Sequence, residues 1–122
     1  MSLHDVRLTL LDMLEYGEQA IGFLEGRGQG DLDSDVQLRF ALIRALEIFG
    51  EAASRLPATF RAENREIPWR SIIATRNRLA HAYDRVDNTV VWNAAALEVP
   101  EVLNLLRIAL AGLEEPADDI AR

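Results

Sequence analysis

The sequence predicts an all-α protein folded as an antiparallel four-helix bundle. The chain has 122 residues, of which 49% are hydrophobic, so it is long enough for one core and too short for two. Apolar residues recur at alternating steps of three and four, the spacing of a helix stripe. Residues 89–92 are β-branched enough to fit a strand as well as a helix. Breaks containing glycine or proline divide the chain into four periodic segments, and we expect one domain over residues 1–122.

The first two helices are predicted from apolar stripes and from the residues that bound them. The stripe over residues 3–25 predicts the first helix, and the glycine-rich residues 26–31 end it. Ser34 and Gln37 have the spacing of a capping box, which places the start of the second helix there. Pro57 stops it. Its broad apolar surface fits a wide contact within one subunit and a contact with a second copy equally well.

The third helix follows a polar connection. Residues 59–66 are predicted to form a loop with one short turn at most. Pro68 suits the first turn of a helix, because its missing N–H has no helical partner there. We expect this helix to continue to Tyr83 or Arg85.

The fourth helix is expected to be interrupted. Asp87 or Asn88 is a suitable cap for its start. Pro100 removes a backbone hydrogen bond and crowds the preceding turn, which predicts a kink or break between about residues 96 and 100. The acidic residues 114–122 are predicted to be a frayed tail.

Charge is distributed unevenly. The formal net charge is −7, which argues against a protein that coats DNA or RNA through a general positive field. All 13 basic residues are arginine, and residues 61–85 hold six of them against three carboxylates, a local excess of +3. This segment is either a focused anion-binding zone or a solvated helix face with surface ion pairs.

Cysteine is absent and only two histidines are present, so we expect no disulfide, no metal site and no cofactor. No apolar run reaches the length of a membrane span, and no leader opens the chain. These features predict a cytoplasmic protein that does not enter a membrane.

The third helix carries the candidate site. At about 100° per residue, Arg76, Asn77, His81 and Tyr83 fall within one arc of roughly 160°. Histidine can transfer a proton near neutral pH, and arginine offers a planar fork that matches phosphate. Asn77 can orient the imidazole or donate to a phosphate oxygen, and Tyr83 can stack on a base. Taken singly, each of these residues is more often structural or merely exposed.

Three other residues have no predicted part in the chemistry. We expect Trp69 and Trp92 to be anchors of the core or of an interface. His4, next to the terminus, is expected to be exposed and without function.

The spacing Arg76-x4-His81-x-Tyr83, with Asn77 directly after the arginine, resembles the signature of HepT-like proteins of the HEPN superfamily. Segments 45–53 and 67–70 resemble flanking blocks of that family, as do residues 86–87 and 90–92. The match covers about residues 40–95.

The resemblance implies a helical bundle that dimerises, with RNA as substrate and cleavage by attack of the 2′-hydroxyl without a metal. Arg76 and His81 would be the catalytic pair and Asn77 would support them, while Arg70 and Arg78 are weaker candidates for phosphate contacts. Such proteins are typically toxins silenced by a nucleotidyltransferase antitoxin of the MntA type. That antitoxin would transfer AMP to Tyr83, placing negative charge and bulk beside the catalytic pair.

Other functions stay open on the sequence alone. A non-catalytic subunit that binds a nucleotide or a nucleotidyltransferase through the same groove would suit the acidic surface. A plain helical oligomerisation module is a weaker alternative. The intact set of arginine, histidine and tyrosine favours the ribonuclease. The pattern leaves open whether Glu51 faces the motif or solvent.

Overall fold

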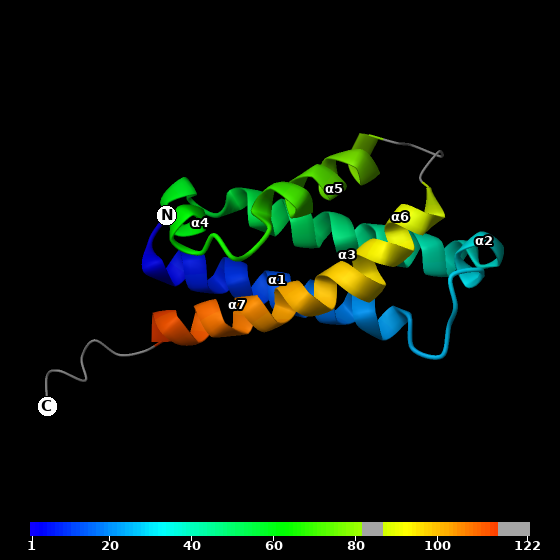
Figure 1. The fold of residues 1–122 in the computed structure, drawn as a ribbon, viewed down its shortest axis with the longest axis horizontal. Coiled ribbons are helices and arrows are strands. Elements are labelled where there is room, and N and C mark those ends of the chain that lie inside the picture. Colours follow the sequence, from blue (N-terminus) through cyan, green and yellow to red (C-terminus); the bar gives the residue numbers. More distant parts are fainter. Residues whose placement is uncertain (82–86, 115–122) are drawn as a thin grey trace, which may run out of the picture.

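The computed structural model describes residues 1–81 and 87–114, without the side chains of His81 and Glu114. All regular structure in these ranges is helical. Four rods alternate in direction (Figure 1), which confirms the predicted antiparallel four-helix bundle. The rods are α1 (Leu3–Phe23), α3 (Val36–Arg55), α5 (Trp69–His81) and a last rod made of α6 (Asn88–Asn93), the π-helix η1 (Ala94–Glu98) and α7 (Val99–Glu114).

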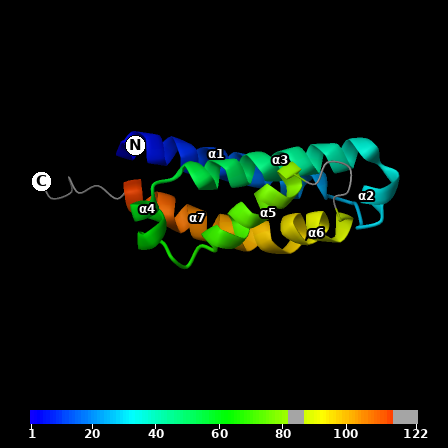
Figure 2. The ribbon, with the colours of Figure 1, turned by 90° about the horizontal axis from the view of Figure 1, so that it is seen from above.

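The core lies mainly between α1, α3 and α7. Helix α1 packs against α3 and α7, whereas α5 packs chiefly on α3. The two views in Figures 1 and 2 show α5 crossing over α3 at the side of the bundle. Burial of apolar area drives this packing, and the largest side chains removed from solvent are Leu10, Met13, Leu32, Leu42, Leu56, Ile67, Val91, Leu103 and Leu106.

Helix α1 begins with a capping box that the sequence pattern did not predict. The Ser2 hydroxyl accepts from the Asp5 backbone N–H at 3.0 Å, and the Asp5 carboxylate accepts from the Ser2 N–H at 3.1 Å. The helix ends at Phe23, two residues before the predicted end. A turn follows in which Gly26 has a φ of 72°, a conformation that glycine adopts without strain.

The capping box predicted at Ser34 and Gln37 is wrong. A short helix, α2 (Asp31–Ser34), precedes α3, and Ser34 is its last residue. Asp35 caps α3 instead, because its carboxylate accepts from the Leu38 backbone N–H at 3.1 Å. The same carboxylate binds Arg27 at 2.6 Å, which fixes it in the capping position.

The prediction of a loop over residues 59–66 is also wrong for most of that segment. Helix α3 ends just before Pro57, as expected. Pro57 is also the N-cap of another helix, α4 (Ala58–Glu63). Phe60 on this helix is buried and packs against Trp69. Tertiary burial of one aromatic side chain therefore stabilises a helix that is too short to form alone.

The last rod begins at the predicted cap and is interrupted where expected. The Asp87 carboxylate accepts from the Thr89 backbone N–H at 2.8 Å, and the ambiguous residues 89–92 are helical. At η1 the Val99 N–H donates to the Ala94 carbonyl, a wider π turn directly before Pro100. A π turn accommodates the proline because it displaces the helical hydrogen bonds that proline cannot make.

Two predictions fall outside the described residues: the extension of the third helix to Tyr83 or Arg85, and a frayed tail beyond residue 114. Within residues 1–81 and 87–114, no helix has both the length and the hydropathy to span a bilayer.

Candidate functional site

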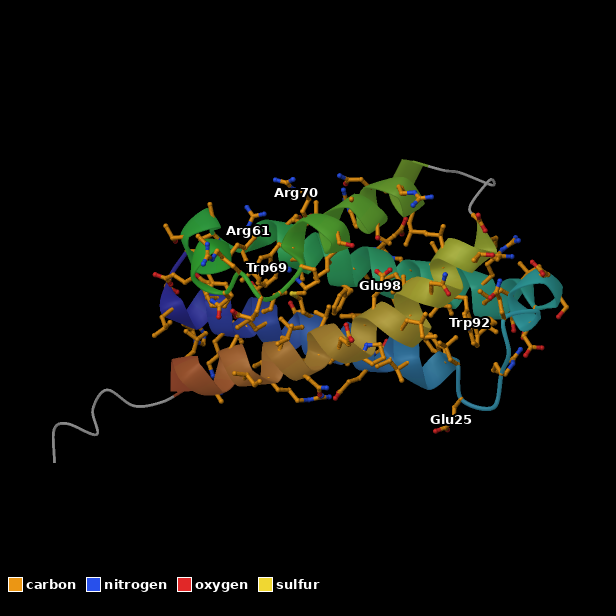
Figure 3. The ribbon with its side chains drawn as sticks, viewed as in Figure 1. Glu25, Arg61, Trp69, Arg70, Trp92 and Glu98 are labelled. Atoms are coloured by element: carbon orange, nitrogen blue, oxygen red, sulfur yellow. The ribbon has the colours of Figure 1, made fainter. Side chains whose placement is uncertain are left out.

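Helix α5 is anchored at its first residue. Trp69 is buried, its indole N–H donates to the Asn64 carbonyl at 3.0 Å, and its ring meets Phe60 edge to face at 6.2 Å between centroids. Trp69 is therefore a core anchor, as predicted. Trp92 is half-buried and packs against the core. Figure 3 labels both tryptophans, Trp69 at the start of α5 and Trp92 on α6.

Arg76 is held by two side chains. One terminal nitrogen lies 2.6 Å from a carboxylate oxygen of Glu51 on α3, and the other donates to the Asn77 Oδ1 at 3.0 Å. The Arg76 side chain is 32% exposed, so it still reaches solvent. A guanidinium has five N–H donors, and these contacts use two of them. The remaining donors can bind an anion without breaking the contacts that fix the group.

Gly50 allows α5 to approach α3 at this point. A methyl group at Gly50 would overlap Arg76 Cβ, and it would lie 2.9 Å from Arg76 Cγ and 3.3 Å from the Ile72 carbonyl oxygen. Only glycine fits such a close approach without a shift of one helix. Gly50 and Glu51 thus form a two-residue support for Arg76, one by leaving room and the other by binding the guanidinium.

The sequence pattern does not predict this support. Gly50 and Glu51 belong to a segment that resembles a family block, and the pattern leaves open which way Glu51 faces. The signal that would have found them is a glycine at an otherwise buried helix position with a carboxylate directly after it. The structure shows that Glu51 faces Arg76.

Arg76 opens onto a groove between α3 and α5, which we call the α3–α5 groove. Its volume is about 480 Å³. The arginines along it are matched by carboxylates: Arg44 lies 3.5 Å from Glu47, and Arg55 lies 3.7 Å from Asp12. The lining residues are Arg44, Glu47, Ile48, Glu51, Arg55, Arg76 and Ala80.

A second groove lies between α4 and α5, and we call it the α4–α5 groove. It is about as large as the first, and it is lined by Ala58, Arg61, Trp69, Arg70, Ile73, Ala74 and Asn77. Asn77 belongs to this groove and also accepts the hydrogen bond from Arg76. The two grooves therefore share the Arg76–Asn77 edge of α5.

The predicted site residues divide into those that the structure places and those that it does not. Arg76 and Asn77 are in contact, and Arg70 lines the α4–α5 groove. Arg78 is exposed and lines neither groove, and His4 is exposed as expected.

His81 is the last residue of α5, four positions after Asn77. Its side chain and the whole of Tyr83 lie outside the described residues. The meeting of Arg76 with His81 and Tyr83 therefore stays a prediction.

The described arginines fall into two classes. Five make ion pairs with carboxylates: Arg27, Arg44, Arg55, Arg76 and Arg107. Five have no ion pair in the described part of the chain: Arg39 lies on α3 over the Phe40 ring, and the other four belong to α4, α5 or the segment between them, Arg61, Arg65, Arg70 and Arg78. Surface ion pairing, the alternative left open by the sequence, thus accounts for Arg76 and not for its neighbours.

Metal ligands do not gather in the described residues: no three histidine or acidic side chains within 1–81 and 87–114 are arranged to hold an ion.

Comparison with known proteins gives one family. The model for "Ribonuclease HepT-like" matches residues 13–108. "Putative RNase MJ0125" of Methanocaldococcus jannaschii is 30% identical over 94% of this chain and 99% of its own length. "Putative RNase MJ1380" of the same organism is 33% identical over 84% of this chain and 94% of its own. "Probable ribonuclease HepT" of Thermococcus cleftensis is 42% identical over 59% of this chain and 66% of its own. No solved structure matches the chain significantly.

Proposed function

The chain belongs to the ribonuclease HepT-like family, and from this premise we propose that it is an endoribonuclease that cleaves RNA without a metal, as the toxin of a toxin–antitoxin pair. Arg76 and His81 are its catalytic residues and Asn77 supports them. The observation that carries the proposal is the fixed guanidinium of Arg76, bound by Glu51 and Asn77 and still open to a groove. A guanidinium that is held in place before the substrate arrives stabilises developing negative charge without further reorganisation.

The proposed step is a transesterification. The ribose 2′-oxygen forms a bond to the adjacent phosphorus, and the bond from phosphorus to the 5′-oxygen of the next nucleotide breaks. His81 serves as the acid/base: the 2′-hydroxyl loses a proton and the leaving 5′-oxygen gains one. The remaining N–H donors of Arg76 bind the non-bridging oxygens, whose charge increases in the transition state. The products are a 2′,3′-cyclic phosphate and a 5′-hydroxyl.

The test is cleavage of a 5′-labelled single-stranded RNA by purified protein in the presence of EDTA. Wild type is expected to produce 2′,3′-cyclic phosphate ends. Arg76→Ala and His81→Ala should each lose about a hundredfold or more in rate, since each removes a group used in the transition state. Matched controls are Arg107→Ala, which breaks a remote ion pair on α7, and His4→Ala, at an exposed histidine. Equal cleavage by Arg76→Ala and wild type would refute the site.

Regulation by AMP transfer belongs to the same proposal. A nucleotidyltransferase of the MntA type would attach AMP to Tyr83: the phenolic oxygen bonds to the α-phosphorus of ATP, pyrophosphate leaves, and the phenolic proton is released. The added phosphate would compete with the RNA phosphate for Arg76. Incubation with the transferase and ATP should add the mass of AMP units on Tyr83. The other tyrosine, Tyr16 on α1, is the internal control, and modification there would refute the proposal.

A non-catalytic binding subunit remains the second candidate, favoured by the net charge of −7, which slows encounter with RNA. It predicts binding of nucleotide or of the transferase by wild type with intact RNA after prolonged incubation. We further propose that the protein acts as a homodimer, which sedimentation of the wild-type chain would test.

A further inference from the structure

Three arginines that have no ion pair in the described part of the chain belong to α4, the start of α5 or the segment between them. Arg61 from α4 and Arg70 from α5 both line the α4–α5 groove, and Figure 3 labels them on the same side of the molecule. Arg65 lies on the connection between these helices. None of the three is neutralised by a carboxylate in the described part of the chain. In a chain with a net charge of −7, uncompensated arginines on one side form a local attraction for an anion.

The groove is held in shape by its own floor. Phe60 and Trp69 are both buried and their rings touch, and the next residue after each is an arginine. The Trp69 indole is also tied to the Asn64 carbonyl at 3.0 Å. The aromatic contact therefore fixes the backbone from which Arg61 and Arg70 project. The fixed backbone keeps both arginines at the groove, and only their side chains lose conformational freedom when they bind.

One donor of Arg61 is unpaired. Its Nε is buried and has no hydrogen-bond partner among the described residues. Buried polar groups in native structures are nearly always hydrogen-bonded, and an unsatisfied donor costs free energy. A rotation of the Arg61 side chain toward the groove would bring this N–H to a phosphate oxygen and satisfy it.

The groove also continues into the proposed catalytic site. Asn77 lines it and accepts from Arg76 through its Oδ1, which leaves the amide N–H groups of Asn77 to donate to another oxygen. Arg70 precedes Asn77 by seven residues, which places the two on nearly the same face of α5, about 10 Å apart along the helix axis. A single strand bound at Arg76 therefore has an adjacent, positively charged path along α5.

We propose that the α4–α5 groove binds the sugar-phosphate backbone of single-stranded RNA next to the cleaved bond, with Arg61 and Arg70 on consecutive phosphates. This inference rests on the proposed ribonuclease function and adds to it a binding site outside the catalytic residues. Backbone contacts position a nucleic acid without reading its sequence. The groove would therefore raise affinity for every RNA and leave the choice of cleavage site unchanged.

The test measures binding apart from cleavage. The probe is a fluorescein-labelled 20-nucleotide RNA with 2′-O-methyl sugars, which lacks the nucleophilic hydroxyl, and binding is followed by anisotropy over a series of salt concentrations. Arg61→Gln and Arg70→Gln should each weaken binding roughly threefold to tenfold and lower the salt slope by about 0.7 for each lost phosphate contact. Arg65→Gln makes the same change in charge outside the lining of the groove and should have a smaller effect.

A second pair of variants adds charge in place of removing it. Ala58→Glu puts a carboxylate into the groove, whereas Thr59→Glu puts the same charge on the neighbouring exposed position outside its lining. Only the first should weaken binding beyond the general effect of one negative charge. Because both positions are exposed on the first turn of α4, folding is little affected.

The outcomes separate the two proposals. Two results would overturn the proposal that the α4–α5 groove binds RNA. One is that Arg65→Gln and Arg70→Gln weaken RNA binding equally, and the other is that the Arg61→Gln, Arg70→Gln double variant has unchanged RNA affinity. The second of these results is also the one expected if an acidic protein segment occupies the groove. Failure of wild type to cut the unmodified RNA overturns the ribonuclease function, and it leaves the binding data on the 2′-O-methyl probe to be judged alone.

Discussion

The two grooves beside α5 are alike in size and opposite in how their arginines are used. In the α3–α5 groove Arg76 is bound to Glu51 at 2.6 Å, and the neighbouring Arg44 and Arg55 are also paired with carboxylates. In the α4–α5 groove Arg61 and Arg70 make no ion pair with any described residue, and the Nε of Arg61 is buried without a hydrogen-bond partner among them. One groove compensates its charge within the chain and the other leaves it uncompensated.

The difference separates positioning from attraction. A carboxylate that binds an arginine fixes the guanidinium and removes most of its long-range field, so the group is precise and attracts little by itself. An arginine without a carboxylate attracts phosphate and is free to adjust to it. Arg76 is fixed by an ion pair where we propose the chemistry, whereas Arg61 on α4 and Arg70 on α5 have no ion pair with a described residue where we propose binding.

The largest effect is expected from Gly50→Ala, which breaks the fixed side of the comparison. The added methyl overlaps Arg76 Cβ and approaches the Ile72 carbonyl oxygen, so α3 and α5 must separate. We expect the free energy of unfolding to fall by about 1–3 kcal/mol, as for other overpacked sites, and RNA cleavage to fall by about a hundredfold because Arg76 moves.

Gly22→Ala on α1 is the matched control for that change. A methyl group there meets nothing within 4 Å, and alanine is the better helix former. Its stability should be unchanged or raised by up to about 1 kcal/mol, with cleavage intact. Thermal melts and cleavage rates measure both variants, and similar results for the two would show that the close approach at Gly50 is unimportant.

A smaller effect is expected from Glu51→Gln, which sharpens the comparison by removing the charge that compensates Arg76. The pair is partly exposed, at 32% and 42% for the two side chains, so the change in stability should stay below about 1 kcal/mol. Cleavage should fall roughly tenfold, since the guanidinium loses a partner that orients it.

Glu18→Gln is the control for charge and distance. Glu18 lies 2.6 Å from Arg107, the same separation as in the Glu51–Arg76 pair, but it joins α1 to α7. Glu18→Gln should change the free energy of unfolding by as little as Glu51→Gln does, and it should leave the rate of RNA cleavage unchanged. If Glu51→Gln also left the cleavage rate at the wild-type value, Glu51 would be a surface partner without a positioning role.

Much of the fold was predictable because it depends on local signals. Apolar periodicity predicts the four rods, Asp87 is one of the two caps predicted for the last rod, and Pro100 marks the interruption that the structure resolves as a π turn. The errors arose where distant contacts decide. Asp35 caps α3 partly because Arg27 binds it, and α4 forms because Phe60 is buried against Trp69.

The site shows the same limit. Arg76 and Asn77 are predicted from helical spacing and from a motif, and Arg70 is a weaker candidate from a local excess of arginine, all of which are properties of one segment. The role of Gly50, the direction of Glu51 and the inclusion of Arg61 in a groove depend on how α3 and α4 meet α5. Helix spacing within one segment carries no information on which neighbour will face it, so these residues required coordinates.

The smallest effect concerns a compensated arginine far from both grooves and depends on pH. Hydrogen bonds from the Arg27 side chain and then from the Leu38 backbone N–H lower the pKa of Asp35 below its usual value of 3.8. A carboxylate with a lowered pKa in the folded state stabilises it at neutral pH, and this contribution is lost as the pH falls through the folded-state value. Asp35→Asn should therefore lower the Tm by a few degrees at pH 7, because asparagine keeps the cap but loses the ion pair.

The difference in Tm between wild type and Asp35→Asn should shrink steadily below pH 4, as Asp35 itself becomes neutral. Asp87→Asn is the control, since it replaces another capping carboxylate that has no ion pair in the described residues. A constant difference from pH 7 to pH 3 would mean that the Arg27 contact does not stabilise the fold. The carboxylates that pair with Arg27 and with Arg76 would then position these arginines without stabilising the fold.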